Sequence, residues 1–195
     1  SDNDKFAAKG VLHVGLKPPG EGERHVFMSH TQADTDRAEE NIGDRRKQIK
    51  DVANFIEYCL GEESPFSQEV FFMGDLNIVG HGDENADAHP PGPDPEWTQL
   101  FAKPGAPMYT QLVDRWGRDQ CPGGNSGRTD PGFTADAVYP PFRQRLDYVF
   151  SSAASQLALQ HLRIDRALAD PNGAVPYLSD HLPLRADFHQ RLPYC

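Results

Sequence analysis

Two polar side chains stand directly after a run of apolar residues in the middle of the sequence. The run 70–73 is typical of a strand that is buried on both faces, and Asp75 and Asn77 follow it. Residues two positions apart in a strand place their side chains on the same face, so a carboxylate and an amide would lie together. Carboxylate oxygens are preferred ligands of Mg²⁺, and amide hydrogens bind phosphate oxygens. From this motif alone, an Asx turn that closes the strand is an alternative explanation.

An adjacent acid and imidazole, Asp180 and His181, precede the last strand pattern of the sequence. Neighbouring side chains point to opposite faces of a strand, so the two groups are predicted to do separate work. Asp180 is predicted to bind a metal ion, and neutral His181 is predicted to be the general base for a water molecule. The alternative for this pair is a polar turn before the strand.

A third carboxylate, Asp147, interrupts the otherwise apolar strand pattern 146–150. A buried carboxylate needs a partner, and one use of it is to orient and charge-stabilise an imidazole, as the acid of a catalytic triad does. The alternative is a structural ion pair with Arg143 or Arg145. His30 ends another strand pattern and has the chemistry to hold a phosphoryl oxygen or protonate a leaving group, although a lone histidine there also fits a core.

The elements that must position these groups follow from the spacing of apolar residues. Three- and four-residue spacing predicts a helix between Asp44, its N-cap, and Gly61, its stop. Asp94 and Pro95 predict the start of a short second helix. The polar candidates then lie where predicted strands end, which is the usual place for a catalytic site on a rigid scaffold. Alternating or continuous apolar patterns predict strands over 6–17, 25–32, 70–73, 146–150, 157–164 and 183–188, with loops over 80–95 and 117–136.

Size and composition are those of a single globular domain over residues 1–195. No run of about 18 apolar residues is present, so no transmembrane segment is expected. The formal net charge is −10. This charge makes a duplex-DNA enzyme less favoured, because proteins that bind a nucleic-acid backbone gather Lys and Arg on one face. The short run 45–47 is the exception in an otherwise acidic chain.

The three cysteines, Cys59, Cys121 and Cys195, are widely spaced and form no CxxC pair of the kind that binds zinc. Cys59 lies in the helical pattern and is predicted to be buried. Cys121 and Cys195 lie in loop-like or terminal sequence and are candidates for a disulfide in an oxidising compartment. The first residues have no apolar signal-peptide region, yet export stays open, and a secreted or periplasmic location is favoured over the cytoplasm.

Four short motifs follow one another in a recognisable order. They are Ser-His-Thr-Gln at 29–32, Gly-Asp-Leu-Asn at 74–77, Arg-Leu-Asp-Tyr-Val-Phe at 145–150 and Ser-Asp-His-Leu-Pro at 179–183. In this order they resemble the endonuclease/exonuclease/phosphatase superfamily, over about residues 6–190. The resemblance implies an α+β fold, the four-layer α/β/β/α sandwich of DNase I-like proteins. This chain would be the C-terminal portion of such a domain, with the N-terminal half missing.

The resemblance also implies roles for the candidate residues. Asp75 and Asn77 would position the phosphate and the attacking water. Asp180 would help to bind a divalent cation, Mg²⁺ or another such as Mn²⁺ or Ca²⁺. His181 would be the general base, and Asp147 would orient it.

His30 would contact the phosphate and stabilise charge or assist the leaving group. Members of this superfamily also carry an Asn and a metal-binding Glu well before this histidine, and no residue among the 29 that precede it fits that context. The chain alone is therefore expected to have little activity and to need the missing N-terminal half as its partner. It is also expected to expose apolar surface where the absent strands would pair.

The function expected from these features is metal-dependent hydrolysis of a phosphoester by base-activated water. Segments 112–116 and 132–134 resemble loops of sphingomyelinase-like members, which favours a lipid head group or small phosphodiester over nucleic acid as the substrate. The stretch 142–147 lacks the Trp-Cys-Asp-Arg-type motif of inositol-phosphate phosphatases. The alternative is a non-catalytic binding module that keeps the fold but lacks the metal-binding Glu.

Overall fold

The secondary structure of this chain is mixed, with helices and strands following one another along the sequence. The computed structural model describes residues 9–33, 38–61, 68–79, 95–102, 112–115, 134, 145–153, 155–164 and 181–190. In chain order these residues form β1 (Val11–Leu16), β2 (Arg24–Ser29), α1 (Ala38–Leu60), β3 (Glu69–Asp75), α2 (Pro95–Trp97), the π-helical turn η2 (Thr98–Ala102), β4 (Leu112–Asp114), β5 (Asp147–Ser152), β6 (Leu157–Ile164) and β7 (Leu184–Gln190).

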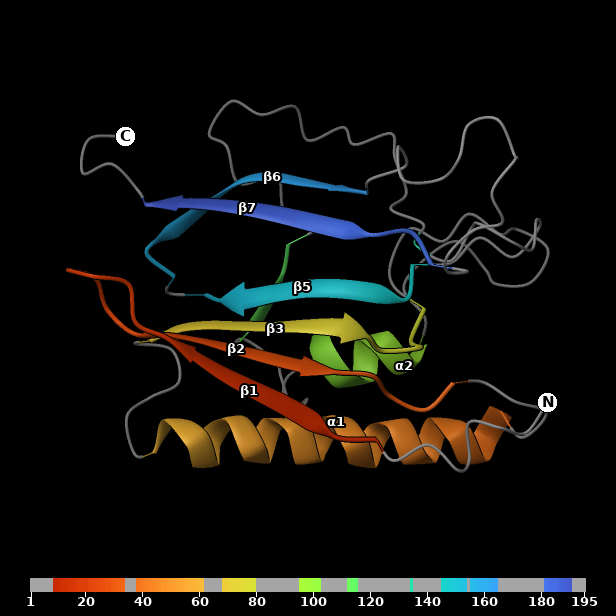
Figure 1. The fold of residues 1–195 in the computed structure, drawn as a ribbon. Coiled ribbons are helices and arrows are strands. Elements are labelled where there is room, and N and C mark those ends of the chain that lie inside the picture. The colour runs from red at the N-terminus through yellow and green to blue at the C-terminus, as the bar shows by residue number, and fades with distance from the viewer. Residues whose placement is uncertain are drawn as a thin grey trace.

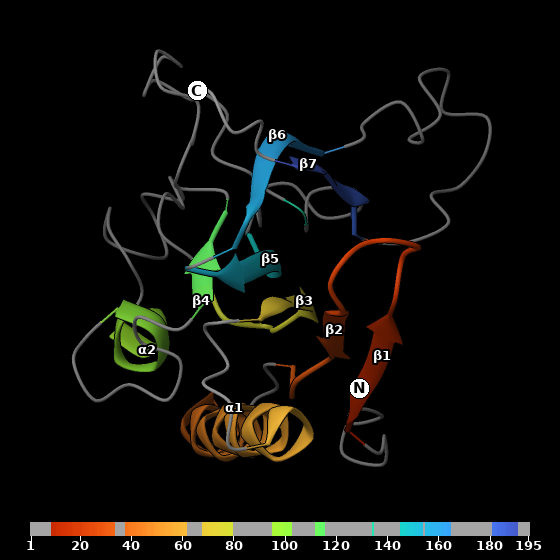
Figure 2. The ribbon, with the colours of Figure 1, turned by 90° about the vertical axis from the view of Figure 1, so that its left-hand side faces the viewer.

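The strands form one five-stranded sheet, in the order β1-β2-β3-β5-β4, and one two-stranded sheet of β6 and β7. β1 and β2 form an antiparallel hairpin, and β2 and β3 are parallel, with α1 between them in the chain. β5 runs antiparallel to both β3 and β4. Figure 1 and Figure 2 show α1 and α2 along one face of the large sheet and β6–β7 over the other face. The described elements are therefore stacked in three layers.

Helix α1 begins at Ala38, so the prediction that Asp44 is its N-cap was wrong. Its first turns bury polar side chains, Asn41 and Arg45, on the stripe that continues to Ile49. Residues four apart lie on the same face of a helix, so these positions face the core although they are not apolar. A search for apolar spacing passes over them, which is why the sequence placed the start of the helix too late.

The predicted stop of α1 at Gly61 is confirmed. Gly61 has φ of 70°, a left-handed conformation that glycine adopts without steric cost, and its N–H donates to the carbonyl of Glu57 at 3.0 Å. Cys59, in the last turn, packs partly buried against the core, and burial raises the pKa of its thiol. Cys59 was predicted to be buried, and the structure shows it only partly buried.

The central strands β3 and β5 separate two hydrophobic clusters because their side chains alternate between faces. Phe72 and Phe150 lie on the helix side, where their rings stack with centroids 5.8 Å apart. Met73 and Val149 belong to the second cluster, toward β6–β7. The end of β3 and the start of β5 are consequently held between two packed layers.

Strand β4 was not predicted, because Leu112–Asp114 is too short to show a period in sequence. It gains its conformation by pairing antiparallel with β5. The short helix predicted to start at Pro95 is present as α2 and continues into η2. In that turn Leu100 and Phe101 are buried, and Phe101 stacks on Phe150 with centroids 5.0 Å apart.

Exposed apolar side chains occur on the edge strand β1, where Leu12 and Leu16 are 56% and 47% exposed. Leu12 pairs in register with Met28, so both project from the face of the sheet that β6–β7 covers elsewhere. The association expected from this surface stays a prediction. Cys121, Cys195 and, apart from Thr134, the loop 117–136 lie outside the described residues.

The helices that the structure describes include none that is both long enough and apolar enough to cross a membrane.

Candidate active site

The last residue of β3 and the first residue of β5 are both aspartates. Asp75 and Asp147 are antiparallel cross-strand partners, so their side chains project from the same face of the sheet. Alternation along the two strands places them on the side of Met73 and Val149, toward β6–β7. The sequence predicted a carboxylate at each strand end, and the register of the strands brings the two carboxylates side by side.

His181, just before β7, brings its imidazole to both carboxylates. Its Nδ1 lies 2.7 Å from Oδ2 of Asp147, and its Nε2 lies 3.6 Å from Oδ2 of Asp75. The contact predicted between Asp147 and His181 is therefore present. A proton on Nδ1, facing the carboxylate of Asp147, leaves Nε2 as the nitrogen that accepts a proton.

His30 reaches the same place from the other neighbour of β3. Because β2 and β3 are parallel, they end at the same edge of the sheet, and Nε2 of His30 lies 3.5 Å from Oδ2 of Asp75. The side chain of His30 is 57% exposed, so its interpretation as a core histidine is wrong. The N–H of Thr31 donates to the carbonyl of Asp75 at 3.1 Å, which ties the end of β2 to the end of β3.

Asn77 closes β3 in an Asx turn, the alternative left open by its sequence motif. Its backbone N–H donates to Oδ1 of Asp75 at 2.9 Å, and its φ of 49° is a conformation that asparagine tolerates. The side-chain Nδ2 donates to the carbonyl of Thr31 at 3.2 Å. A carboxamide has two N–H hydrogens, so this contact leaves donor capacity, and the predicted phosphate contact of Asn77 stays a prediction.

The electrostatic balance at Asp75 is unfavourable to its charged form. Burial, and then the neighbouring carboxylate of Asp147, raise the pKa of Asp75. The N–H of Asn77 and the imidazoles of His181 and His30 act in the opposite direction without cancelling the rise. The site therefore contains two adjacent carboxylates whose mutual repulsion a positive charge would relieve.

The donor set fits a divalent cation. Asp75, Asp147 and His181 each offer a ligand atom, and these atoms all lie within 4.8 Å of one another. Carboxylate oxygens are the preferred ligands of Mg²⁺, Mn²⁺ and Ca²⁺, so the two carboxylates carry this fit. The predicted metal ligand Asp180 lies outside the described residues.

The ion pair proposed as an alternative for Asp147 is wrong for Arg145. Nη1 of Arg145 lies 2.7 Å from Oδ2 of Asp114 on β4, and its guanidinium stacks over the ring of Tyr148, 4.7 Å from the centroid. Arg143 lies outside the described residues. Arg145 thus anchors β4 to the start of β5, and the carboxylate of Asp147 contacts the imidazole of His181 instead.

The basic run 45–47 is partly structural. Arg45 is buried and forms two hydrogen bonds with the carboxylate of Glu96, at 3.0 and 2.8 Å. Its Nη1 also donates to the carbonyl of Gln32 at 3.2 Å. This guanidinium therefore holds α2 and the segment after His30 against α1, and it is not a surface charge for a nucleic-acid backbone.

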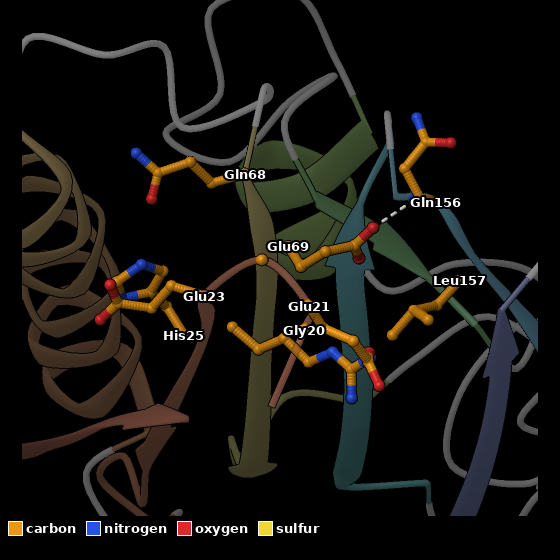
Figure 3. A pocket seen from close by; sticks show the side chains of 10 residues that line it. Gly20, Glu21, Glu23, His25, Gln68, Glu69, Gln156 and Leu157 are labelled. Carbon is orange, nitrogen blue, oxygen red and sulfur yellow. Dashed lines mark hydrogen bonds and ion pairs between the residues drawn. The ribbon is translucent and has the colours of Figure 1, made fainter. Parts of the chain in front are cut away.

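A separate cavity of about 640 Å³ lies where β3 begins, at the opposite end of that strand from Asp75 (Figure 3). Two of the carboxylates that line it, those of Glu69 and Glu21, have partners within the protein. Glu69 accepts hydrogen bonds from Ser155 Oγ and from the N–H of Gln156, and Glu21 pairs with Arg24. Among the described residues that line this cavity, none belongs to the candidate active site.

The segment that carries this geometry matches a known family. The model of the Endonuclease/Exonuclease/phosphatase family matches residues 60–181, which is more than half of the chain. This chain belongs to that family. The matched region contains Asp75, Asp147 and His181, so all three clustered side chains lie within the family's part of the sequence.

Individual proteins that resemble this chain cover it to different extents. Sphingomyelinase C 2 of Leptospira interrogans is 32% identical over 85 residues, which are 43% of this chain and 13% of that protein. TDP2 of D. rerio, complexed with a single-strand DNA product, has a TM-score of 0.60 at 19% identity, over 93% of this chain and 62% of that one. The human Nocturnin catalytic domain with a bound sulfate has a TM-score of 0.57 at 17% identity, over 94% and 53% of the two chains.

A beta toxin of Staphylococcus aureus with bound magnesium ions has a TM-score of 0.50 at 18% identity, over 91% of this chain and 57% of that one. At such identities the likeness to solved structures shows the fold alone. The predicted α+β class and DNase I-like fold are confirmed, and the described residues supply three of the four layers. The chain spans less than two thirds of the length of each of these relatives.

One residue shapes the site of this family member without having been predicted to do so. Gly74, just before Asp75, has φ of 142°, and a Cβ built there would overlap the carbonyl oxygen of Ser29. The absence of a side chain lets the ends of β2 and β3 approach closely enough for His30 to reach Asp75. The signal in the sequence is the glycine itself, at a place where a buried strand ends.

Proposed function

We propose that this protein hydrolyses a phosphoester, with a water molecule activated by His181 as the nucleophile. The observation that carries the proposal is the position of its imidazole, with Nδ1 at 2.7 Å from Asp147 and Nε2 directed to Asp75 at 3.6 Å. Membership of the Endonuclease/Exonuclease/phosphatase family supports this class of reaction.

His181 and His30 are assigned different proton transfers in this reaction. Asp147 accepts the Nδ1–H of His181, which keeps the ring in one tautomer and stabilises it when Nε2 takes the proton of the attacking water. As the water oxygen bonds to phosphorus, the bond from phosphorus to the leaving oxygen breaks. His30 is exposed and lies 3.5 Å from Asp75, and it would contact the same phosphate, where it would stabilise charge or give a proton to the leaving oxygen.

A divalent cation, Mg²⁺ or another such as Mn²⁺ or Ca²⁺, is the proposed cofactor. Asp75 would hold it together with Asp180, the ligand implied by the family motif, while the carboxylate of Asp147 holds His181. When bound, such an ion supplies charge stabilisation to the phosphoryl oxygens. The magnesium ions bound to a beta toxin of the same fold support this choice.

A phosphodiester of a lipid head group is the proposed substrate class. The 32% identity to sphingomyelinase C 2 supports it, and so does the net charge of −10, which opposes binding of a polyanionic duplex. The single-strand DNA product bound to D. rerio TDP2 makes an oligonucleotide the competing substrate. A non-catalytic binding module is the alternative in which the fold is kept without turnover.

The proposal is tested on the full-length natural protein, because this chain spans only part of its relatives. Release of phosphorylcholine from sphingomyelin vesicles, and cleavage of a single-stranded oligonucleotide, are measured with Mg²⁺ and again with excess EDTA. We expect lipid hydrolysis that EDTA abolishes. Binding of the vesicles without hydrolysis of any phosphoester would establish the binding module instead.

A matched pair of histidine variants connects any activity to this site. His181→Ala should lower kcat by about 10³-fold or more, since general-base catalysis is worth about 10²–10⁴-fold and the imidazole also contacts both carboxylates. His189→Ala changes an exposed histidine of β7 and should leave kcat within about twofold. Equal loss in the two variants would contradict the assigned role of His181.

A further inference from the structure

Thr134 is a fully buried residue that contacts both segments carrying the Asp147–His181 pair. Its Oγ1 accepts the backbone N–H of Leu146 and of Asp147, each at 3.1 Å. Its carbonyl oxygen accepts the N–H of Leu182 at 2.7 Å. One residue is thus hydrogen-bonded to the backbone of the acid and to the backbone directly after the imidazole.

The two N–H groups that meet on this hydroxyl are neighbours in the chain. Successive N–H groups of an extended strand point to opposite edges, so their convergence on one oxygen requires a bent backbone at Leu146–Asp147. On the other edge, the carbonyl of Leu146 accepts the N–H of Leu76, the residue after Asp75. The start of β5 is therefore hydrogen-bonded on both edges, to Leu76 just after β3 on one edge and to Thr134 on the other.

The position of the Asp147 carboxylate depends on this bend, because Asp147 is the first residue of β5 and has no earlier strand residue to direct it. Its Oδ2 must stay 2.7 Å from Nδ1 of His181 to hold the ring. A hydroxyl oxygen has two acceptor lone pairs, and both are matched here by backbone donors, one buried and one partly buried. A methyl group in its place would leave both donors unpaired and release the bend.

We propose that Thr134 is a positioning residue, whose hydroxyl fixes the backbone of Asp147 so that the carboxylate engages Nδ1 of His181. This inference rests on the proposed function for its kinetic consequence, but its structural part is independent of any turnover. The hydroxyl and the carbonyl of Thr134 bond to backbone N–H groups, so Thr134 acts through the backbone of Asp147.

The test compares Thr134→Val, which keeps the shape and removes the hydroxyl, with Thr134→Ser, which keeps the hydroxyl. The control is Ser152→Ala, at the far end of β5, where an equally buried hydroxyl donates to the carbonyl of Gln68 at 3.0 Å. The primary readout is the low-field proton resonance of the His181 ring N–H in the full-length protein, assigned by its absence in His181→Ala.

We expect Thr134→Val to lose or strongly shift that resonance, and Thr134→Ser and Ser152→Ala to keep it. In sphingomyelin hydrolysis, Thr134→Val should lower kcat by about tenfold or more with KM within about threefold, because the imidazole and not substrate binding is disturbed. Thr134→Ser should recover most of the rate.

An unshifted resonance in folded Thr134→Val would overturn the inference. Equal losses in Thr134→Val and Thr134→Ser would also overturn it, because Thr134→Ser keeps the hydroxyl and should therefore keep the contact. If Thr134→Val does not fold, Thr134→Ala is measured in its place, and failure of both to fold would show that Thr134 maintains the whole domain and not this pair. A shifted resonance in a protein without phosphoesterase activity would keep the inference and contradict the proposed function.

Discussion

Nδ1 of His181 lies 2.7 Å from Oδ2 of Asp147, although the two residues are 34 positions apart in the chain. The acid stands at the start of β5, in the five-stranded sheet, and the imidazole stands just before β7, in the two-stranded sheet. The contact therefore joins the two sheets, and it exists only when both are packed together.

Asp147→Asn should lower kcat by about 10²–10⁴-fold while KM changes by less than about threefold. The amide oxygen still accepts a hydrogen bond from Nδ1, but it has no charge to stabilise the imidazolium, and the NH₂ group favours the wrong tautomer. Steady-state kinetics on the complete protein measures the effect. Asp187→Asn, which removes a carboxylate paired with Arg185 on β7, is the control and should leave both constants near their original values.

Asp75→Asn should stabilise the metal-free protein while it removes activity. The fold raises the pKa of Asp75, so the folded state holds this proton more tightly than the unfolded chain does. That contribution to stability is complete below the unfolded pKa of about 4 and is lost as the pH rises through the folded pKa. Asparagine cannot ionise, so the variant does not lose this stability as the pH rises.

The measurement for Asp75→Asn is the Tm in EDTA at pH 7 and at a pH below that unfolded value. We expect a gain of a few degrees at pH 7 and none at the acidic pH. Asp51→Asn, on the exposed face of α1, is the control. A lower Tm for Asp75→Asn at pH 7 would show that the hydrogen bond from Asn77 outweighs the repulsion by Asp147.

Gly74→Ala should destabilise the fold by about 3 kcal/mol or more, because alanine is strained at φ of 142° and its Cβ would overlap the carbonyl of Ser29. Urea unfolding gives this free energy. Gly43→Ala is the matched control: it lies inside α1, its added Cβ meets nothing within 4 Å, and it should stabilise the fold by about 0.5–1 kcal/mol. A small effect at Gly74 would mean that β2 and β3 separate easily at the site.

Arg45→Met should cost about 3–5 kcal/mol of unfolding free energy, since it leaves the buried carboxylate of Glu96 without its guanidinium. Arg46→Met, at the exposed neighbour, should change stability by less than about 0.5 kcal/mol. Adding Glu96→Gln to Arg45→Met should recover part of the loss. An equally small effect at both arginines would contradict the structural role of Arg45. The run 45–47 would then be interpreted as a group of surface charges.

The types of the chemical groups and their places at strand ends were determined by the sequence itself. An apolar run that stops at Asp75, an apolar strand broken by Asp147, and an Asp-His pair before the last strand are local patterns. Local periodicity of this kind reports burial and backbone conformation, so it also predicted the bounds of β6 and the stop of α1 at Gly61. Where the buried side chains are polar, as at Arg45 in the first turns of α1, apolar periodicity does not show that the helix is present.

The partners of those groups were decided only by the tertiary structure. The register of β3 against β5 sets Asp75 opposite Asp147, and a slip of one residue would turn either carboxylate to the helix side. The pairing of Arg145 with Asp114, and not with Asp147, depends on a three-residue strand that exists only because β5 lies beside it. Such contacts are fixed by packing between elements distant in the chain, and no local pattern records them.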